Sequence, residues 1–197
     1  MDFVDTYLIE AKNIIDSLIL ESKNINKIIE DLITLRDYNR GRVFIIGIGG
    51  SAANASHMVN DLRKLCGIEA YTPTDNVSEF SARTNDDGFD TVFIEYLKTS
   101  KFNYKDLLFV LSVGGGNKEK NVSTAIIKAI DYANLQNSHV CGIVGRFDGY
   151  TALKADTVVV VPCVNNLRIT PHAEEFQTVI WHCIVSHPNL QIQKTKW

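Results

Sequence analysis

Residues 43–52 read Val-Phe-Ile-Ile-Gly-Ile-Gly-Gly-Ser-Ala, and this stretch decides the fold. It begins with four consecutive β-branched or aromatic residues, which predict a short strand buried on both faces. Glycines follow at once, and residues 52–66 then fit a helix. A buried strand, a Gly-rich turn and a helix in this order begin a βαβ unit, so the strand belongs to a parallel sheet.

The same alternation of strand and helix continues along the rest of the chain. Apolar runs predict further strands at 68–71, 107–111, 140–144 and 157–161. Helical segments are predicted after Asn76, the clearest at 89–97, and then at 123–135 and 172–186. We therefore expect an α/β protein in three layers, with helices covering both faces of a parallel sheet.

A long helical segment precedes this α/β pattern. Residues 3–38 carry apolar side chains at three- and four-residue spacings without a Gly or Pro, which predicts one long helix or two joined closely. We expect one domain over residues 1–197, with a helical extension at 1–40 and an α/β core at 41–197. The extension has more apolar surface than one edge of the core can cover, which predicts that it is used in oligomerisation, in a tetramer.

Composition and charge exclude several classes of protein. The net charge is −3 and the basic residues are scattered, so neither nucleic acid nor a membrane is expected as a partner. The acidic N-terminus is unlike a secretory signal, and no apolar run is long enough to span a bilayer, so we expect a cytoplasmic protein. The four cysteines contain no C-x-x-C pair and are expected to be reduced core residues.

Two Gly-rich loops follow strands, at Gly47–Ser51 and at Ser112–Asn117. In parallel sheets ligands bind beyond the carboxyl ends of the strands, where glycines let the backbone approach a phosphate. The first loop also matches a dinucleotide fingerprint through Gly47, Gly49 and Ala52, with an acidic residue at Glu69. Taken alone, the first loop could bind a phosphate ester, bind a dinucleotide or be only a structural turn. The second loop favours a phosphate ester.

Four ligand-type residues pair at helical spacing on two predicted helices. His57 and Asp61 are four residues apart, and Glu174 and His182 are eight apart, so each pair shares a face of its helix. Two imidazoles and two carboxylates could form a tetrahedral site for zinc. A solvated His–Asp pair beside a core histidine would give the same pattern, and spacing does not separate the two interpretations.

Four ordered motifs resemble those of a known family. Gly-Ile-Gly-Gly-Ser at 47–51, with His57 and Asp61 after it, is similar to the Gly-Asn-Gly-Gly-Ser…His…Glu segment of phosphoheptose isomerases. Residues 84–89, Thr-Asn-Asp-Asp-Gly-Phe, resemble that family's Gly-Asn-Asp-x-Gly-Phe. Ser112 and its glycines resemble the family's Ser-Thr-Ser-Gly-Asn-Ser, and Glu174-Glu175…His182 resembles Gln-Glu…His. These enzymes belong to the SIS (sugar isomerase) domain family.

The resemblance implies a flavodoxin-like SIS domain, assembled as a homotetramer with active sites between subunits. It implies one divalent metal per subunit, with zinc as the expected ion, on His57, Asp61, Glu174 and His182. The implied substrate contacts are Gly49, Gly50, Ser51, Asp61, Asn85, Asp86, Ser112, Val113, Gly114 and Glu174.

The implied reaction interconverts sedoheptulose 7-phosphate and D-glycero-D-manno-heptose 7-phosphate through a metal-assisted enediol, with Asp61 as base and His182 as acid. The sequence departs from the family at Ile48, Asp61 and Glu174, where the family has Asn, Glu and Gln, and the second loop has lost hydroxyl groups. A non-catalytic SIS module that senses a sugar phosphate or binds a protein is the alternative, and a nicotinamide enzyme is a further one.

Overall fold

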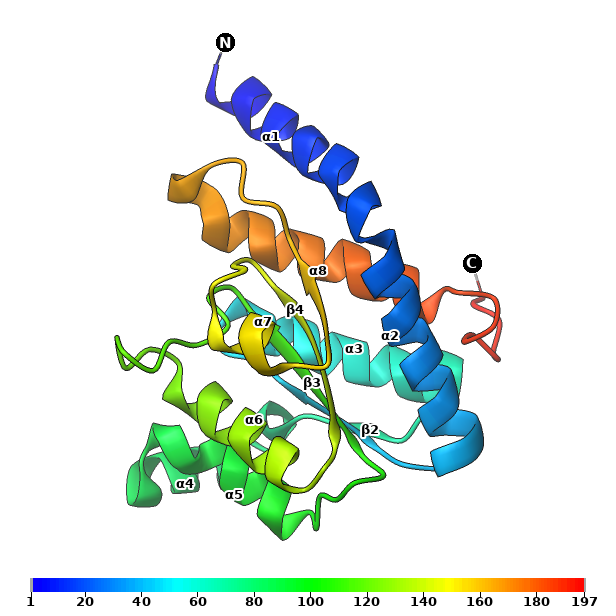
Figure 1. Cartoon of the computed structure of the whole chain (residues 1–197), viewed down its shortest axis with the longest axis vertical. Coiled ribbons are helices and arrows are strands. Elements are labelled where there is room, and N and C mark those ends of the chain that lie inside the picture. Colours follow the sequence, from blue (N-terminus) through cyan, green and yellow to red (C-terminus); the bar gives the residue numbers. More distant parts are fainter. Residues whose placement is uncertain (1, 197) are drawn as a thin grey trace.

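A five-stranded parallel sheet forms the centre of the molecule (Figure 1). The computed structural model describes residues 2–196. The strands run in the order β2-β1-β3-β4-β5, the flavodoxin-like order, which confirms the expected fold class. Their bounds are β1 Val43–Ile46, β2 Ala70–Tyr71, β3 Leu107–Ser112, β4 His139–Val144 and β5 Thr157–Val160.

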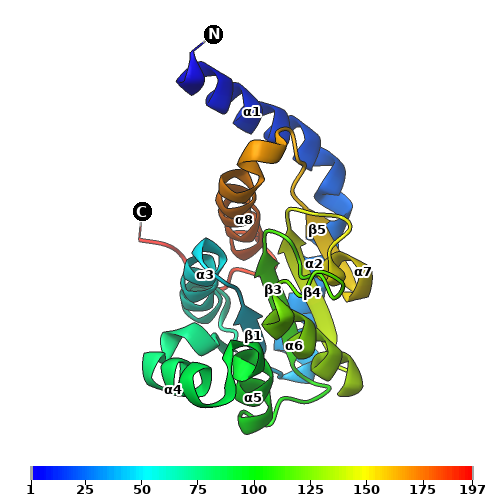
Figure 2. The same cartoon turned by 90° about the vertical axis from the view of Figure 1, so that its left-hand side faces the viewer.

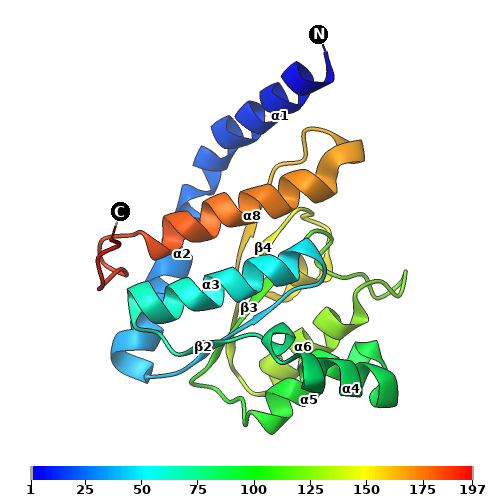
Figure 3. The same cartoon turned by 180° about the vertical axis from the view of Figure 1, so that it is seen from behind.

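Helices cover both faces of this sheet (Figures 2 and 3). One layer contains α2 (Ser22–Thr34), α3 (Gly50–Cys66) and α8 (Ile169–Val185). The other contains α5 (Val92–Thr99), α6 (Thr124–Leu135) and α7 (Tyr150–Lys154), with α4 (Val77–Asp87) packed beside α5. Two hydrophobic cores result, one on each face, because alternate strand residues point to opposite sides of a sheet.

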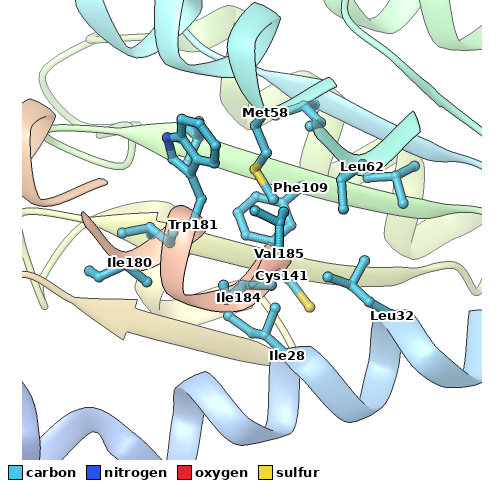
Figure 4. Close-up of a cluster of buried hydrophobic side chains, with 14 of the residues drawn as sticks. Ile28, Leu32, Met58, Leu62, Phe109, Cys141, Ile180, Trp181, Ile184 and Val185 are labelled. Atoms are coloured by element: carbon cyan, nitrogen blue, oxygen red, sulfur yellow. The ribbon is translucent and has the colours of Figure 1, made fainter. Parts of the chain in front are cut away.

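The larger core joins α2, α3 and α8 to the sheet (Figure 4). Met58 and Leu62 of α3 meet Trp181 and Ile184 of α8 there, and Leu32 of α2 closes the cluster. All five side chains are fully buried. This core fixes α3 and α8 against each other, and these two helices carry the predicted ligand residues.

The N-terminal extension divides at a short turn. Helix α1 (Phe3–Leu18) is capped by Asp2, whose carboxylate accepts the Asp5 N–H at 2.8 Å, and Ile19–Glu21 form a 3₁₀ turn before α2. Figure 2 shows α1 projecting beyond the α/β body. A stripe of exposed apolar side chains runs along this part, at Val4, Leu8, Ile15 and Ile19.

A polar network holds α1 against the start of α8. The Glu10 carboxylate accepts two hydrogen bonds from the Arg168 guanidinium, at 2.6 and 2.7 Å, and lies 3.0 Å from Nε2 of the buried His172. These contacts, led by Arg168, lower the pKa of Glu10 well below its usual range. The hydrogen bond from the Tyr7 hydroxyl to Glu175 raises the pKa of Tyr7 to about 12.

Several element boundaries differ from the sequence prediction. The short helix α7 was not predicted, and α8 starts at Ile169 rather than at residue 172 because its first turn accommodates Pro171. The expectation that all four cysteines are core residues is wrong, since Cys163 and Cys183 are exposed while Cys66 and Cys141 are buried. Within residues 2–196, no helix is both long enough and apolar enough to cross a membrane.

Candidate active site

Helices α3 and α8 lie side by side and run in the same direction (Figure 3). Successive residues of α3 contact successive residues of α8, from Asn54 with Glu174 to Asp61 with His182. The amide of Asn54 donates to the Glu174 carbonyl oxygen at 2.9 Å and to the Gln177 side-chain oxygen at 3.1 Å. Further along, His57 reaches Trp181. We call this contact the α3–α8 seam, and its two helices carry all four predicted metal ligands.

Three of the four predicted metal ligands meet at one point of the seam. Oδ2 of Asp61 lies 3.9 Å from His57 Nε2 and 3.8 Å from His182 Nε2. One donor atom from each residue lies within 4.8 Å of the others. The Asp61 side chain is only 13% exposed, whereas the His57 and His182 rings face solvent more openly. Two imidazoles around one largely buried carboxylate form a donor set that suits zinc.

Glu174, the fourth predicted ligand, lies elsewhere on the seam. Its carboxylate sits against Gly50 at the start of α3, where a Cβ on residue 50 would be 2.4 Å from Glu174 Oε2. Eight residues of helix separate the Cα atoms of Glu174 and His182 by about 12 Å. Glu174 is therefore outside the His57–Asp61–His182 cluster, although the positive end of the α3 dipole favours its charge there.

Trp181 forms the inner wall of the cluster. It is fully buried, and its ring centroid lies 3.6 Å from that of His182 and 4.7 Å from that of His57. Its indole Nε1 has no hydrogen-bond partner, and the same holds for Gln177 Nε2 and Ser51 Oγ. Among the described residues, these are the buried side-chain polar atoms without a partner, and all of them are on α3 or α8. Buried polar side-chain atoms are usually hydrogen-bonded, so the two helices of the seam carry the least satisfied polar atoms of the described residues.

The first Gly-rich loop turns the chain from β1 into α3. Gly49 has φ +65° and ψ −130°, a conformation that only glycine adopts without strain. Gly47 approaches the backbone of Ser51 so closely that a Cβ on it would lie 2.5 Å from the Ser51 carbonyl oxygen. The loop thus places Ser51, 1% exposed, in the first turn of α3.

The second Gly-rich loop is held by its own hydrogen bonds. Ser112 Oγ accepts the Gly115 N–H at 3.0 Å, and the Gly115 carbonyl oxygen accepts the Thr151 hydroxyl at 2.8 Å. Gly145 N–H donates to the Val113 carbonyl oxygen at 2.9 Å. A Cβ built on Gly114 would meet no atom within 4 Å, so there is space for a ligand on that side of the loop.

Asn85 and Asp86 lie apart from the other predicted contacts. Both are exposed near the end of α4, where the Asn85 amide donates to the Asp86 carboxylate at 2.8 Å. Within residues 2–196, no hydrogen bond or ion pair joins them to the Gly-rich loops or to the His57–Asp61–His182 cluster. Within a single chain, Asn85 and Asp86 therefore do not lie at the α3–α8 seam.

A groove of about 590 Å³ opens beside the cluster. Asp61 and His182 lie at its lining together with Arg63 and Lys64 of α3, and the chain after α8 forms another wall. Ile192 N–H donates to the Leu65 carbonyl oxygen at 2.9 Å, which fixes that wall. The cluster is therefore accessible to a small polar ligand.

A second group of donors was missed by the sequence prediction. Asp31 of α2 meets His139 and Cys141 of β4, with one donor atom of each within 4.8 Å of the others. The signal was His-x-Cys at the start of a predicted strand, because residues two apart in a strand point to the same face. Asp31 is more than one hundred positions away, and no local pattern links it to this pair.

Comparison with known proteins bears on the fold and the family of this chain. The model of the SIS domain matches residues 6–145. The phosphoheptose isomerase of Mycobacterium bovis is 31% identical over 193 residues, which cover 94% of this chain and 90% of that protein. The solved phosphoheptose isomerase from Francisella tularensis superposes with a TM-score of 0.81 at 21% identity, covering 94% and 97% of the two chains.

A second solved phosphoheptose isomerase, from Neisseria gonorrhoeae, gives a TM-score of 0.79 at 24% identity, with 92% of this chain and 94% of that one covered. Because both solved structures are less than 25% identical to this chain, their similarity supports the fold alone. The family model and the Mycobacterium relative bear on the family as well. The chain belongs to the SIS domain family, as a phosphoheptose-isomerase-like member.

Proposed function

We propose that this protein is an isomerase that interconverts a phosphorylated ketose and aldose, with sedoheptulose 7-phosphate and D-glycero-D-manno-heptose 7-phosphate as its pair. The observation that carries the proposal is the Asp61 carboxylate between His57 and His182, in a chain of this family. A protein that only binds a sugar phosphate has no need for a carboxylate between two imidazoles at the edge of an open groove. Its relatives are named as isomerases of this class.

The proton transfers are assigned to two residues of the cluster. Asp61 Oδ2 would remove the proton from the carbon next to the carbonyl, and His182 Nε2 would donate a proton to the carbonyl oxygen, which gives an enediol. The two atoms are 3.8 Å apart, so both reach adjacent atoms of one substrate. Asp61 would then return its proton to the former carbonyl carbon, while His182 takes up the proton of the other enediol hydroxyl, so that the new carbonyl group forms.

The cluster also suits a divalent metal, zinc for preference, which His57, Asp61 and His182 would hold. With the metal bound, the proton for the substrate oxygen would come from the His182 ring nitrogen that the metal does not occupy. A metal bound there would polarise the carbonyl group and stabilise negative charge on its oxygen. Glu174 would complete a four-residue set only if its side chain turned away from Gly50. In its present position the Glu174 carboxylate would accept hydrogen bonds from sugar hydroxyl groups rather than bind the metal.

The phosphate of the substrate is assigned to the second Gly-rich loop. Glu174 places a negative charge at Gly50, which would repel a phosphate from the start of α3 and leaves Ser51 to contact sugar hydroxyls. The loop from Ser112 to Gly114 carries no carboxylate and has room for an oxyanion. Asn85 and Asp86 would contact substrate only from another subunit.

Assembly as a homotetramer with sites between subunits is part of the proposal. The stripe formed by Val4, Leu8, Ile15 and Ile19 is 45–69% exposed on each residue, which is unfavourable for a helix left in water. Pairing of this extension with other copies would cover the stripe. Light scattering should return the mass of four chains, and the mass of one chain at micromolar concentration would contradict the assembly.

The test of the proposed function is proton NMR of the purified protein with a panel of sugar 7-, 6- and 5-phosphates. We expect ketose–aldose interconversion of the 7-phosphate, loss of the reaction after chelation, and recovery when zinc is added back. Tight binding without turnover of any member would overturn the proposal in favour of a sugar-phosphate sensor.

A further inference from the structure

A second cluster of potential metal ligands lies near the amino ends of the strands, whereas the Gly-rich loops lie at their carboxyl ends. His139 begins β4 and Cys141 follows two residues later on the same face, while Asp31 reaches them from α2. Asp31 Oδ2 lies 2.9 Å from His139 Nε2 and 3.9 Å from Cys141 Sγ. Cys141 is fully buried, so this thiol belongs to the interior of the protein.

These separations are close to those of a zinc centre. With zinc bonds of about 2.0–2.3 Å to N, O and S and tetrahedral angles, the N···O distance is about 3.4 Å and the S···O distance about 3.6 Å. The observed 2.9 and 3.9 Å differ from these values by about half an ångström or less. Side-chain adjustment alone would admit the ion.

The surrounding groups orient the three donors. His139 Nδ1 lies 3.5 Å from Asp156 Oδ2, the carboxylate–imidazole arrangement that commonly supports a histidine ligand through its second nitrogen. Asp156 is itself fixed, because its carboxylate accepts the Val140 N–H at 2.8 Å. The Thr157 hydroxyl donates to Asp31 Oδ2 at 3.3 Å and so helps to hold that carboxylate in place.

The charges also balance. The Asp31 carboxylate and a Cys141 thiolate together carry −2, which one divalent cation neutralises when His139 is a neutral ligand. Lys27, paired with Asp31 at 2.5 Å, and Asp156 carry opposite charges and cancel. Binding would replace the thiol proton of Cys141 by the metal and release that proton to solvent.

A small cavity gives access to the cluster. It measures about 140 Å³ and is lined by Asp31 and His139, together with Leu35, Tyr104 and Asp106. This volume holds a water molecule as a fourth ligand with room to spare. The buried thiol is therefore reached from the side of Asp31 and His139.

We propose that Asp31 Oδ2, His139 Nε2 and Cys141 Sγ form a second metal site, selective for zinc or a similar thiophilic ion, that fastens α2 to the sheet. A thiolate and an imidazole exclude Mg²⁺ and Ca²⁺, which require oxygen ligands. The site shares no residue with the His57–Asp61–His182 cluster, and its role is structural. It does not depend on the proposed isomerase function.

Cobalt(II) tests this proposal, because a cobalt–thiolate bond gives a charge-transfer band in the near ultraviolet. The His57–Asp61–His182 cluster contains no cysteine, so its cobalt complex lacks that band. We expect the metal-free protein to develop the band on titration with Co²⁺, and to keep it in the double variant His57→Ala/Asp61→Asn. Zinc added afterwards should remove it.

Matched cysteine variants identify the ligand. Cys141→Ser should abolish the band, whereas Cys183→Ser should leave it unchanged although Cys183 is exposed beside His182. If Cys141→Ser does not fold, His139→Gln replaces it and should weaken cobalt binding by about tenfold or more. Absence of the band in the wild-type protein, or its persistence in Cys141→Ser, would overturn the proposal. Full isomerase activity in Cys141→Ser is expected and keeps the two tests separate.

Discussion

Asp61→Asn is the substitution that most sharply separates catalysis from folding. The side chain keeps its shape, but it loses the negative charge between His57 and His182 and can no longer accept a proton from substrate. In the folded protein the Asp61 carboxylate accepts one hydrogen bond, from the Asn60 amide at 2.8 Å. Its contacts with the two imidazoles, at 3.8 and 3.9 Å, are longer than hydrogen bonds.

The structure therefore predicts a large effect on rate and a small effect on stability. General-base catalysis contributes on the order of 10²–10⁴ in rate, so the loss should be at least about 10²-fold. This corresponds to about 2.7 kcal/mol of transition-state stabilisation. In the metal-free protein the free energy of unfolding should change by less than about 1 kcal/mol, because partly exposed ion pairs of this length contribute little.

The assay is the rate of sugar-phosphate isomerisation, measured by NMR, alongside urea unfolding and the zinc content of each variant. Asp61→Glu restores the residue usual in the family and should retain activity, while Glu30→Gln removes an exposed carboxylate on α2 and should change nothing. Asp61→Asn protein that turned over at the wild-type rate without bound metal would refute the assignment of this site.

Three further predictions concern other parts of the structure. Trp181→Ala empties a fully buried site and should lower the free energy of unfolding by about 3–5 kcal/mol in urea titrations; less than about 1 kcal/mol would contradict the packing described. Arg168 holds the pKa of Glu10 below its usual value, so Glu10 adds stability above its unfolded pKa of about 4.3 and loses it as the pH falls through the lower folded value. Glu10→Gln should flatten the acid limb of the stability–pH curve, and an unchanged limb would contradict the network. Burial raises the pKa of Cys66 to about 11, so iodoacetamide should modify Cys66 only after unfolding while the exposed Cys163 reacts in the folded protein, as mass spectrometry would show.

Local patterns were sufficient to predict the sheet and most of its helices. Val43–Ile46 and Leu107–Ser112 are apolar throughout because both faces of their strands are covered. Helix α7 was not predicted because its five residues are too few to show a helical repeat of apolar side chains. The start of α8 was not predicted because Pro171 lies in its first turn. Helical spacing also predicted the approach of His57 to Asp61, which depends on one helix only.

Contacts between distant elements could not be predicted from spacing. The position of Glu174 at Gly50 depends on how far α8 slides along α3, which the packing of Met58, Trp181 and Ile184 sets. The second donor cluster depends on where α2 crosses β4.

The most direct test of the central claim is turnover of sedoheptulose 7-phosphate in D₂O by the zinc-loaded protein. Transfer of the proton by Asp61 through an enediol, at a site open to the groove beside it, predicts deuterium at the carbon next to the carbonyl in the aldose product. Proton NMR would show this as loss of that carbon's proton signal. A protein that binds the sugar phosphate and leaves both the position of its carbonyl group and its carbon-bound protons unchanged would contradict the claim.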